Sequence, residues 1–371
     1  MSTNQRYSRQ ILLKEFGQLA QDKLSSAKIL VVGVGGLGCP ALQYLAAAGI
    51  GTLGIVDFDT VDISNLQRQI LFSSQDIGRL KTEIAAQRIR TLNSEISVHE
   101  HNLKITNQNA LEIIVNYDIV IDGTDNFVTK YLLNDACVIL GKPYVFGAVF
   151  KFEGQLATFN YPTTDSRVKS NYRDLFPFAP KNAVELSCNE VGVLGVIPGI
   201  IGTMQAAEVI KLLTGIGRSL TNKMLCYNAL ENSLYEFDII PKNPNSQHAP
   251  FDKASFHEFN YELFCNNSVR NAITVEALNE LEIQEEIIFI DIRELDELPE
   301  LKKIKIIKIP LSKLDSELNQ IPTDKKIIFL CQSGIRSQIA VTKFMNFNPT
   351  AKAYSLEGGI DFWINQNELI Q

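Results

Sequence analysis

The sequence has no pair of cysteines at the spacing that holds a metal. Its six cysteines are scattered along 371 residues, and no two of them are three positions apart. This pattern excludes a disulfide framework and indicates a reduced, cytoplasmic setting, in which a cysteine with a role is reactive rather than crosslinked. The histidines also lack the spacing of metal ligands; they are His99, His101, His248 and His257.

An excess of positive charge and a long apolar run are absent as well. Lys and Arg number 35 against 42 Asp and Glu, which gives a net charge of -7 and no basic footprint for nucleic acid. No window reaches the roughly 18 uninterrupted apolar residues of a membrane-spanning helix. The opening segment, MSTNQRYSRQ, has no apolar signal core. We therefore expect neither nucleic-acid nor membrane partners.

Strand-like and helix-like segments alternate along the chain, as is typical of α/β proteins. From residue 28 to about 147, helical stretches separate four β-rich runs, of which three are nearly all apolar: KILVVG, TLGIVD, YDIVIDG and PYVFGA. Buried parallel strands have this composition. The pattern predicts a doubly wound, Rossmann-like sheet with its site at the carboxyl ends of the strands. The alternating segments 151–162 and 223–240 predict antiparallel additions, which make the sheet mixed.

A change in composition divides the chain. Pro, Asn and polar residues dominate 241–255, and new strand-like runs follow: EIIFIDIR, IKIIKIPL and KKIIFLC. A chain of this length is also long for a single core. We expect a first domain over residues 1–240, a linker over 241–268 and a smaller α/β domain over 269–371.

A glycine-rich loop follows the first strand, in ILVVGVGGLGCP. Glycines there let backbone N–H groups approach phosphates, and the next helix directs its positive end at them. Asp57 ends the second strand, 19 residues after Gly38, and is placed to bind a ribose hydroxyl. The loop glycines are Gly33, Gly35, Gly36 and Gly38. Because this pattern is weakly specific, a nicotinamide-dependent enzyme stays open at this point.

Polar and cationic residues that follow Asp57 closely in the sequence favour a triphosphate as the ligand. These residues are Asn65, Arg68 and Lys81. The planar guanidinium of Arg and the compact ammonium of Lys both suit phosphate groups. The segment DGTDN then ends a strand with Asp122 and Asp125, where a carboxylate would hold Mg²⁺ against the phosphates. The alternative is that the cations are solvated and Asp125 caps a helix. Their position on one edge of one sheet favours ATP.

Residues 6 to about 235 resemble the ThiF/MoeB/HesA family, the bacterial relatives of ubiquitin-activating enzymes. The resemblance rests on RYSRQ, GVGGLGCP, DFDTVDISNLQRQ, GRLK, DGTDN, FEGQ and GVIPGIIGTMQAAEVIKLL. It implies ATP-dependent adenylation, with Mg²⁺, of the C-terminal glycine of a small ubiquitin-like sulfur carrier ending in Gly-Gly.

The same resemblance implies roles for single residues. The four loop glycines would frame the nucleotide, Asp57 would take the ribose, and Asp125 would bind Mg²⁺. Arg9, in YSRQ, would reach the phosphates of the other subunit in a homodimer. Within one subunit the phosphates would lie on Asn65, Arg68 and Lys81.

The chain departs from this family at its zinc site. Many members hold a structural zinc with two Cys-x-x-Cys pairs. Here Asn171 and Asp174 stand where the first pair would sit, and the region of the second pair, near PKNPNSQ, has no cysteine. With four thiolates missing we expect no structural zinc, while the adenylation chemistry is unaffected.

A second reactive segment is CQSGIRS, in which Cys331 follows an apolar strand and precedes a helical stretch. Such a turn presents N–H groups that stabilise a thiolate and cradle an anion, and Arg336 adds positive charge. Cysteine phosphatases place five residues between the cysteine and the arginine, whereas four stand here. The shorter loop resembles that of a rhodanese sulfurtransferase, as do FIDIRE and LEGGIDFW over about 270–371. The resemblance implies that Cys331 carries persulfide sulfur.

The rhodanese match has one gap. IKIIKIPL stands in place of the usual H-I-P-G-A element, so an inactive rhodanese fold used only for binding is the alternative. The intact loop from cysteine to arginine argues against it.

Cys188, in ELSCNEVG, lies where the ThiF-type family has a cysteine that is sometimes used covalently. It would form a thioester or an acyl disulfide with the carrier, or resolve a persulfide adduct; a bystander role is equally open. We expect three other cysteines to be packed thiols, namely Cys39, Cys137 and Cys226. Cys265 receives no role.

Together the two domains predict a carrier thiocarboxylate as product. The first would make an acyl-adenylate, and the Cys331 persulfide, loaded by a donor such as a cysteine desulfurase, would supply the sulfur. Both a molybdopterin-type and a thiamine-type carrier stay open. The alternatives are activation of another ubiquitin-like modifier or of a tRNA-thiolation carrier, and a Rossmann-fold NAD-binding protein with a non-catalytic rhodanese module.

Overall fold

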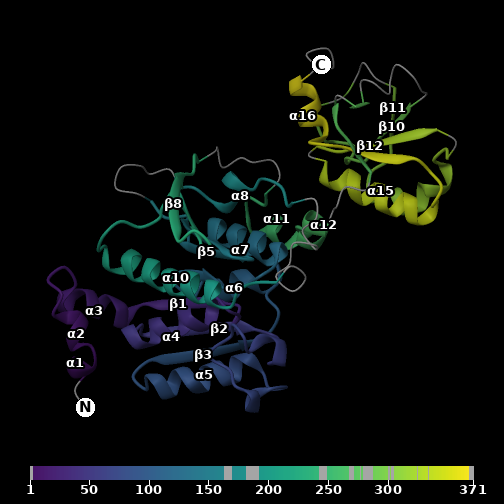
Figure 1. Cartoon of the computed structure of the whole chain (residues 1–371). Coiled ribbons are helices and arrows are strands. Elements are labelled where there is room, and N and C mark those ends of the chain that lie inside the picture. Colours follow the sequence, from purple (N-terminus) through teal and green to yellow (C-terminus); the bar gives the residue numbers. More distant parts are fainter. Residues whose placement is uncertain are drawn as a thin grey trace. The chain divides into compact units, whose positions relative to one another are not determined.

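The computed structural model (Figure 1) describes residues 3–162, 169–180, 192–241, 249–266, 271–275, 277–278, 287–299, 301, 305–323, 325–332 and 334–366. The chain separates into two compact units, Met1–Tyr261 and Glu262–Gln371. Each unit has a sheet of its own.

The first unit is built on an eight-stranded mixed sheet with the strand order β3-β2-β1-β4-β5-β6-β7-β8. The strands from β3 to β5 are parallel, and β6, β7 and β8 are added antiparallel. Their bounds are β1 Lys28–Val32, β2 Thr52–Asp57, β3 Ser97–Asn102, β4 Ile119–Asp122, β5 Tyr144–Phe150, β6 Glu153–Phe159, β7 Lys223–Asn228 and β8 Ser233–Asp238. The predicted mixed, Rossmann-like sheet is confirmed.

Burial explains which strands the sequence predicts. Every residue of β4 and the last four residues of β1 are buried, because these central strands are covered on both faces. Strand β3 lies at the edge of the sheet, where most of its side chains are exposed. Its polar sequence, SVHEHN, does not predict a strand.

Helices cover both faces of this sheet (Figure 1). In one layer α10 contacts α3 and α4, and α4 contacts α5, while α6 and α7 contact each other in the second, as right-handed crossovers require. The short α1 and α2 precede them, and α8 follows β6. The bounds are α1 Thr3–Arg6, α2 Ser8–Ile11, α3 Gly17–Ser26, α4 Gly38–Ala48, α5 Lys81–Leu92, α6 Ala110–Ile114, α7 Phe127–Leu140, α8 Tyr172–Leu175 and α10 Val196–Thr214.

Helix α10 is the one helix of the described residues that is long and apolar enough to cross a membrane by length and composition. Half of its apolar window is buried inside the fold, where it packs against α4, β5 and β6. Its apolar sequence is thus accounted for by its place in the core.

Part of the segment expected to link the domains is folded onto the first unit. It contains α11 Lys253–Glu258 and the start of α12 Tyr261–Asn266. The side-chain amide of Asn107 donates to the carbonyl oxygens of His257 and Phe259, at 2.7 and 3.1 Å. The Tyr261 hydroxyl donates to buried Asp135 at 2.9 Å. These contacts hold the segment against α7 and the loop before α6.

The second unit is a smaller α/β fold with a five-stranded parallel sheet, in the order β11-β10-β12-β13-β9. Trp363 is buried in its last helix and stacks on Phe289 of β10. The predicted second α/β fold is confirmed. Its elements are β9 Ala272–Ile273, β10 Ile287–Asp291, β11 Ile306–Lys308, α14 Leu314–Glu317, β12 Lys326–Leu330, α15 Ile335–Phe347, β13 Ala353–Leu356 and α16 Gly359–Gln366.

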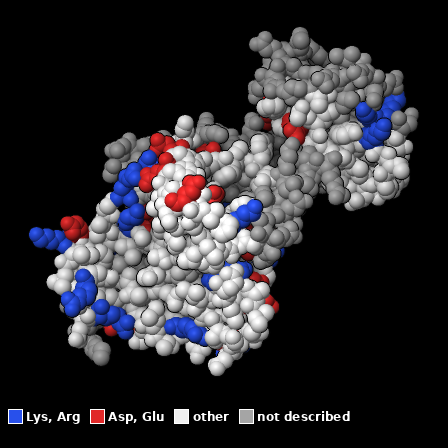
Figure 2. Space-filling model, in the orientation of Figure 1, with Lys and Arg blue, Asp and Glu red and all other residues white. Residues whose placement is uncertain are grey.

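Charged side chains are dispersed among the described residues on the face drawn in Figure 2. On the face drawn in Figure 2, patches of Lys and Arg are small and are separated by uncharged atoms, and acidic groups lie among them. The described residues on this face form no continuous basic stripe of the kind that follows a nucleic-acid backbone.

Candidate functional site

A cavity of about 760 Å³ opens at the carboxyl ends of the parallel strands in the first unit. Its wall includes residues that follow β1, β2 and β4, among them Gly35, Phe58 and Asp125. Strand β1 lies between β2 and β4, so the chain reverses its direction of travel through the sheet at this point. Ligands of doubly wound folds bind at such a switch point.

The glycine loop forms one wall of this cavity. Gly33 has φ +91°, and a Cβ on it would lie 2.7 Å from the carbonyl oxygen of Gly123. Gly33, Gly35 and Gly36 line the cavity, whereas Gly38 begins α4 and does not. A Cβ on Gly38 would meet the Gly33 oxygen at 2.0 Å. Three of the predicted glycines thus face the cavity, and the fourth lets the helix pack on the loop.

Asp57, at the end of β2, is held by two backbone N–H groups. Its Oδ2 accepts from Val34 at 2.7 Å and its Oδ1 accepts from Asp59 at 2.9 Å. Burial raises the pKa of the Asp57 carboxyl, and the charge of Lys81 acts in the opposite direction. Each oxygen keeps a further lone pair, so the carboxylate is able to accept from the hydroxyls of a sugar.

The three residues predicted to bind phosphates are placed differently. Arg68 and Lys81 line the cavity, but Asn65 is not among the lining residues. The Lys81 ammonium is buried and lies 3.0 Å from a carboxylate oxygen of Asp59. Asn65 instead accepts from the backbone N–H of Asp62 at 3.2 Å, within a capping box. Its role in phosphate binding stays a prediction.

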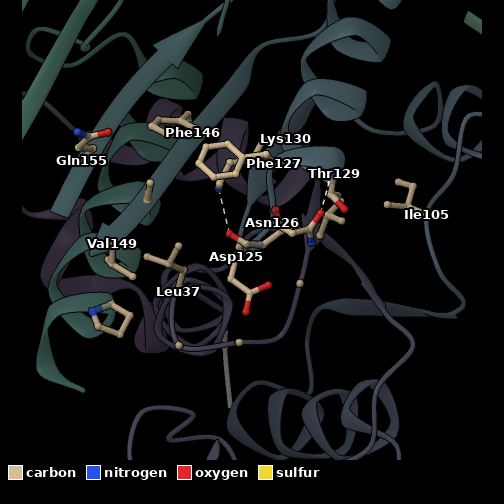
Figure 3. A pocket seen from close by; sticks show the side chains of 18 of the residues that line it. Leu37, Ile105, Asp125, Asn126, Phe127, Thr129, Lys130, Phe146, Val149 and Gln155 are labelled. Atoms are coloured by element: carbon tan, nitrogen blue, oxygen red, sulfur yellow. Dashed lines mark hydrogen bonds between the residues drawn. The ribbon is translucent and has the colours of Figure 1, made fainter. Parts of the chain in front are cut away.

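The two aspartates of DGTDN have distinct environments. Asp122 is buried and accepts from the Lys130 ammonium at 2.8 Å and the Tyr144 hydroxyl at 2.7 Å, while Thr124 donates twice to its other oxygen. Asp125 is exposed on the cavity wall, and in Figure 3 its carboxylate points away from Lys130. Asp122 is therefore structural, and Asp125 is the carboxylate that faces the cavity.

Asp125 suits a magnesium ion that is shared with a nucleotide. Mg²⁺ keeps several waters and is bound by one or two carboxylates together with phosphate oxygens, so a full protein ligand set is not required. Among the described residues, no group of three or more His, Cys, Asp or Glu side chains is placed to hold a metal alone. The residues present fit a magnesium–nucleotide complex in this way.

Lys130 supports the loop that carries Asp125 and is not singled out by the sequence analysis. Besides Asp122, its ammonium donates to the carbonyl oxygens of Thr124 and Gly147, each at 2.9 Å. It thus joins α7 to the end of β4 and to the middle of β5. The available signal was Asp122 itself, because a carboxylate at the end of a buried strand needs a partner.

The structure describes one of the two remaining predicted residues of the first unit, Arg9, and not the other. Arg9 is exposed on α2 and is not among the lining residues. Cys188 lies outside the residues that the structure describes.

At the place of the zinc pair, Asn171 and Asp174 form the cap of α8. The Asn171 side chain accepts from the N–H of Arg173, and Asp174 accepts from the N–H of Asn171.

Three further cysteines are packed thiols, as predicted. Cys39, Cys137 and Cys226 are buried. Burial raises the pKa of the Cys39 thiol to about 12, and it raises the pKa of Cys137 and Cys226 as well.

In the second unit, Cys331 directly follows β12 and lies at the start of the turn into α15. Its Sγ accepts from the backbone N–H of Gly334 at 3.1 Å and from that of Ser337 at 3.3 Å. The Ser337 hydroxyl lies 3.3 Å away. Gly334 has φ +85°, which turns the chain into the helix. Amide donors from the first turn of a helix stabilise a thiolate, or an anion bound to it.

Two ion pairs border this turn. Arg336 donates from both ends of its guanidinium to the two oxygens of Glu297, at 2.5 and 2.6 Å. Asp291 and Arg293, from the FIDIRE segment, form a buried pair at 2.9 Å. Arg293 also donates to the side chain of Gln332, at 3.0 Å, and so supports the residue next to the cysteine.

Comparison with known proteins matches both units. The model of the ThiF family matches residues 7–248, and that of the rhodanese-like domain matches residues 264–366. A probable adenylyltransferase/sulfurtransferase MoeZ of Mycobacterium tuberculosis is 39% identical, over 97% of this chain and 93% of its own length. An adenylyltransferase and sulfurtransferase MOCS3 of Drosophila sechellia is 38% identical, over 96% of this chain and 82% of its own length.

Other relatives match about two thirds of the chain. A sulfur carrier protein adenylyltransferase of Thermus thermophilus is 44% identical, over 70% of this chain and 96% of its own length. Among solved structures, MccB of E. coli with ATP is 26% identical with a TM-score of 0.56, over 66% of this chain and 73% of that chain. The sequence matches, together with the glycine loop and the cysteine turn, establish that the chain belongs to the ThiF family and carries a rhodanese-like domain after the ThiF region.

Proposed function

We propose that this protein uses ATP to adenylate the C-terminal glycine of a small ubiquitin-like sulfur carrier and then supplies sulfur from a persulfide on Cys331. The enzyme is an adenylyltransferase with a sulfurtransferase domain, as are the relatives that it matches nearly end to end. One observation carries the proposal: a single chain holds both a nucleotide-type cavity at a switch point and a cysteine turn with amide donors on its sulfur.

The first step is attack of the carrier carboxylate on the α-phosphate of ATP, with pyrophosphate leaving. The loop of Gly33, Gly35 and Gly36 offers backbone N–H groups to the phosphates, and Asp57 accepts from the ribose. Asn65, Arg68 and Lys81 neutralise the phosphate charge. A magnesium ion on Asp125 would supply further charge neutralisation when bound. Alignment and neutralisation are what this reaction needs most, because the attacking group is already an anion.

The second step moves sulfur onto the acyl group. The terminal sulfur of the Cys331 persulfide attacks the acyl carbon, AMP leaves, and an acyl disulfide joins the carrier to Cys331. A second thiolate then attacks the Cys331 sulfur, so that the thiocarboxylate leaves with the electron pair of the broken S–S bond. We assign that thiolate to Cys188. The resulting Cys188–Cys331 disulfide is reduced by an external dithiol, which closes the cycle.

Further parts of the proposal concern the assembly and its partners. Arg9 reaches the phosphates in the other subunit of a homodimer. The persulfide comes from a donor such as a cysteine desulfurase, and the carrier is of the molybdopterin or the thiamine type. A cytoplasmic setting is supported by Cys39, Cys137, Cys226 and Cys331, which are thiols outside any disulfide.

The test is carrier-dependent exchange of labelled pyrophosphate into ATP, with a molybdopterin-type and a thiamine-type carrier assayed separately. Exchange with one carrier only establishes acyl-adenylation and identifies the pathway. A sample that binds ATP but shows no exchange with either carrier would contradict the proposal.

A further inference from the structure

The arginine of the cysteine turn is already bound to a carboxylate of its own chain. Both terminal nitrogens of Arg336 donate to Glu297, one to each oxygen, at 2.5 and 2.6 Å. Paired hydrogen bonds between two charged groups are among the strongest in proteins. They lower the pKa of the Glu297 carboxyl, so Glu297 is ionised at neutral pH.

Glu297 is fixed in this position by its own loop. The backbone N–H of Glu294 donates to its Oε1 at 2.8 Å, which gives the carboxylate three donors. The side chains of Glu297 and Arg336 are 29% and 35% exposed, so about two thirds of each is shielded from water. The pair is therefore a built part of the turn and not a chance surface contact.

This pairing removes positive charge from the sulfur-carrying turn. Arg336 is close enough to Cys331 for the thiolate to raise the pKa of the guanidinium, although the contact with Glu297 raises it more. The donors that touch the sulfur directly, the N–H groups of Gly334 and Ser337, carry no formal charge. The neighbouring pair of Asp291 and Arg293 is also neutral as a whole.

Sulfur donors differ in the charge that such a turn must accommodate. When the Cys331 thiolate attacks the outer sulfur of thiosulfate, the S–S bond breaks and sulfite leaves with its electron pair, so a dianion enters and a dianion departs. When it attacks the terminal sulfur of a persulfide, a single thiolate departs and takes up a proton. The first reaction gains from a free guanidinium, and the second does not need one.

We propose that Glu297 selects the sulfur donor of Cys331. Because its carboxylate binds both terminal nitrogens of Arg336, Glu297 disfavours small dianionic donors such as thiosulfate. The turn then favours persulfides of low charge, such as the persulfide of a protein cysteine. This inference rests on the proposed function, in which Cys331 carries the persulfide, and it makes Glu297 a specificity-determining residue that acts through Arg336.

The test measures sulfur transfer from two donors to cyanide, with the full-length protein and thiocyanate as the readout. The donors are thiosulfate and N-acetylcysteamine persulfide, which has no carboxylate. We expect Glu297→Gln to raise kcat/KM for thiosulfate about tenfold, the scale of one charge-assisted hydrogen bond, and to leave kcat/KM for the persulfide nearly unchanged. The gain should be lost in the double variant Glu297→Gln/Arg336→Ala, because it comes from the freed guanidinium.

Glu294→Gln is the matched control. It removes the same charge from the same loop, but the Glu294 side chain contacts the Ser312 hydroxyl, at 3.2 Å, and not Arg336. An equal gain in kcat/KM for thiosulfate in this control would overturn the inference. So would a Glu297→Gln variant whose kcat/KM for each donor equals that of the wild type. If wild-type Cys331 takes sulfur from neither donor, the proposed function fails and the inference fails with it. Persulfide transfer without a donor-selective effect of Glu297→Gln rejects the inference alone.

Alkylation of Cys331 gives a second readout that does not depend on turnover. Iodoacetate is an anion and iodoacetamide is neutral, and peptide mass spectrometry assigns the modified cysteine. Glu297→Gln should speed the reaction of Cys331 with iodoacetate relative to iodoacetamide. An unchanged ratio in a folded variant speaks against selection by charge.

Discussion

At the residue scale, Gly35 and Gly38 belong to one loop but serve different purposes. A Cβ on Gly38 would lie 2.0 Å from the Gly33 carbonyl oxygen, whereas the nearest atom to a Cβ on Gly35 is 3.5 Å away. We expect Gly38→Ala to lower the free energy of unfolding of the ligand-free protein by about 1–3 kcal/mol, the cost of overpacking. Gly35→Ala should keep that stability but lose the rise in Tm that ATP and Mg²⁺ produce.

Thermal melts with and without ATP and Mg²⁺ compare the two variants. Gly199→Ala is a suitable control, because Gly199 lies in α10 and a Cβ there has nothing within 4 Å. Alanine favours a helix, so this variant should be at least as stable as the wild type. A Gly38→Ala protein that melts like the wild type would contradict the packing role of this glycine.

Cys39 shows how burial lowers the reactivity of a thiol beside a nucleotide site. Its pKa is raised to about 12, so at pH 8 about one thiol in ten thousand is ionised. Because the thiolate is the reactive form, iodoacetamide at pH 8 should leave Cys39 unmodified in the native protein and modify it in guanidinium chloride. Peptide mass spectrometry provides the measurement, and rapid native labelling of Cys39 would be inconsistent with a packed thiol.

At the scale of elements, Lys130 joins helix α7 to the end of strand β4 and to the middle of strand β5. Its ammonium is buried with Asp122 and contacts the carbonyl oxygens of Thr124, in the Asp125 loop, and Gly147, in β5. Lys130→Met leaves the Asp122 charge buried without its ion-pair partner, and we expect a loss of about 3–5 kcal/mol in the free energy of unfolding. Urea denaturation measures the loss.

A double variant separates the buried charge from the lost packing. Lys130→Met combined with Asp122→Asn should be less destabilised than the sum of the two single variants, because the uncompensated charge is gone. Strict additivity of the two changes would mean that the ion pair is not the cause.

The same elements show where sequence is informative. Apolar strands such as β1 and β4 are predictable because burial on both faces selects their residues. Asp122 and Asp125 are both visible in DGTDN, but only the contacts of Lys130 and Tyr144 reveal that the first is structural and the second faces the cavity. The pairing of Glu297 with Arg336 joins residues 39 positions apart, and no local pattern specifies it.

At the scale of the whole molecule, the chain carries activation and sulfur supply on two units. Local motifs sufficed to predict both, since each site is built from turns at the ends of strands and each turn is contained in one short segment. The segment between them was harder to predict. Its polar composition indicates a linker, but α11 packs on the first unit through backbone carbonyls that accept from Asn107, and composition does not encode such contacts.

The proposed homodimer predicts that two inactive variants recover activity when their subunits are mixed. Arg9 is exposed, and Lys81 lines the cavity. If Arg9 serves the partner's site, Arg9→Ala and Lys81→Ala homodimers are both inactive, whereas a mixed dimer has one site with both defects and one with neither. Random mixing makes about half of the dimers mixed, so about a quarter of wild-type pyrophosphate exchange should return.

Fluorescence energy transfer between labelled subunits verifies that the subunits have mixed before the activity is measured. If Arg9 acts within its own subunit, every site of the mixed dimer keeps one defect and the mixture stays inactive. A chain with both substitutions, mixed with wild type, gives the opposite pattern: its mixed dimers have one defect in each site when Arg9 acts across the interface, and one intact site when it does not. The two mixtures together thus assign Arg9 to one subunit or the other, whatever the absolute activity of the preparation.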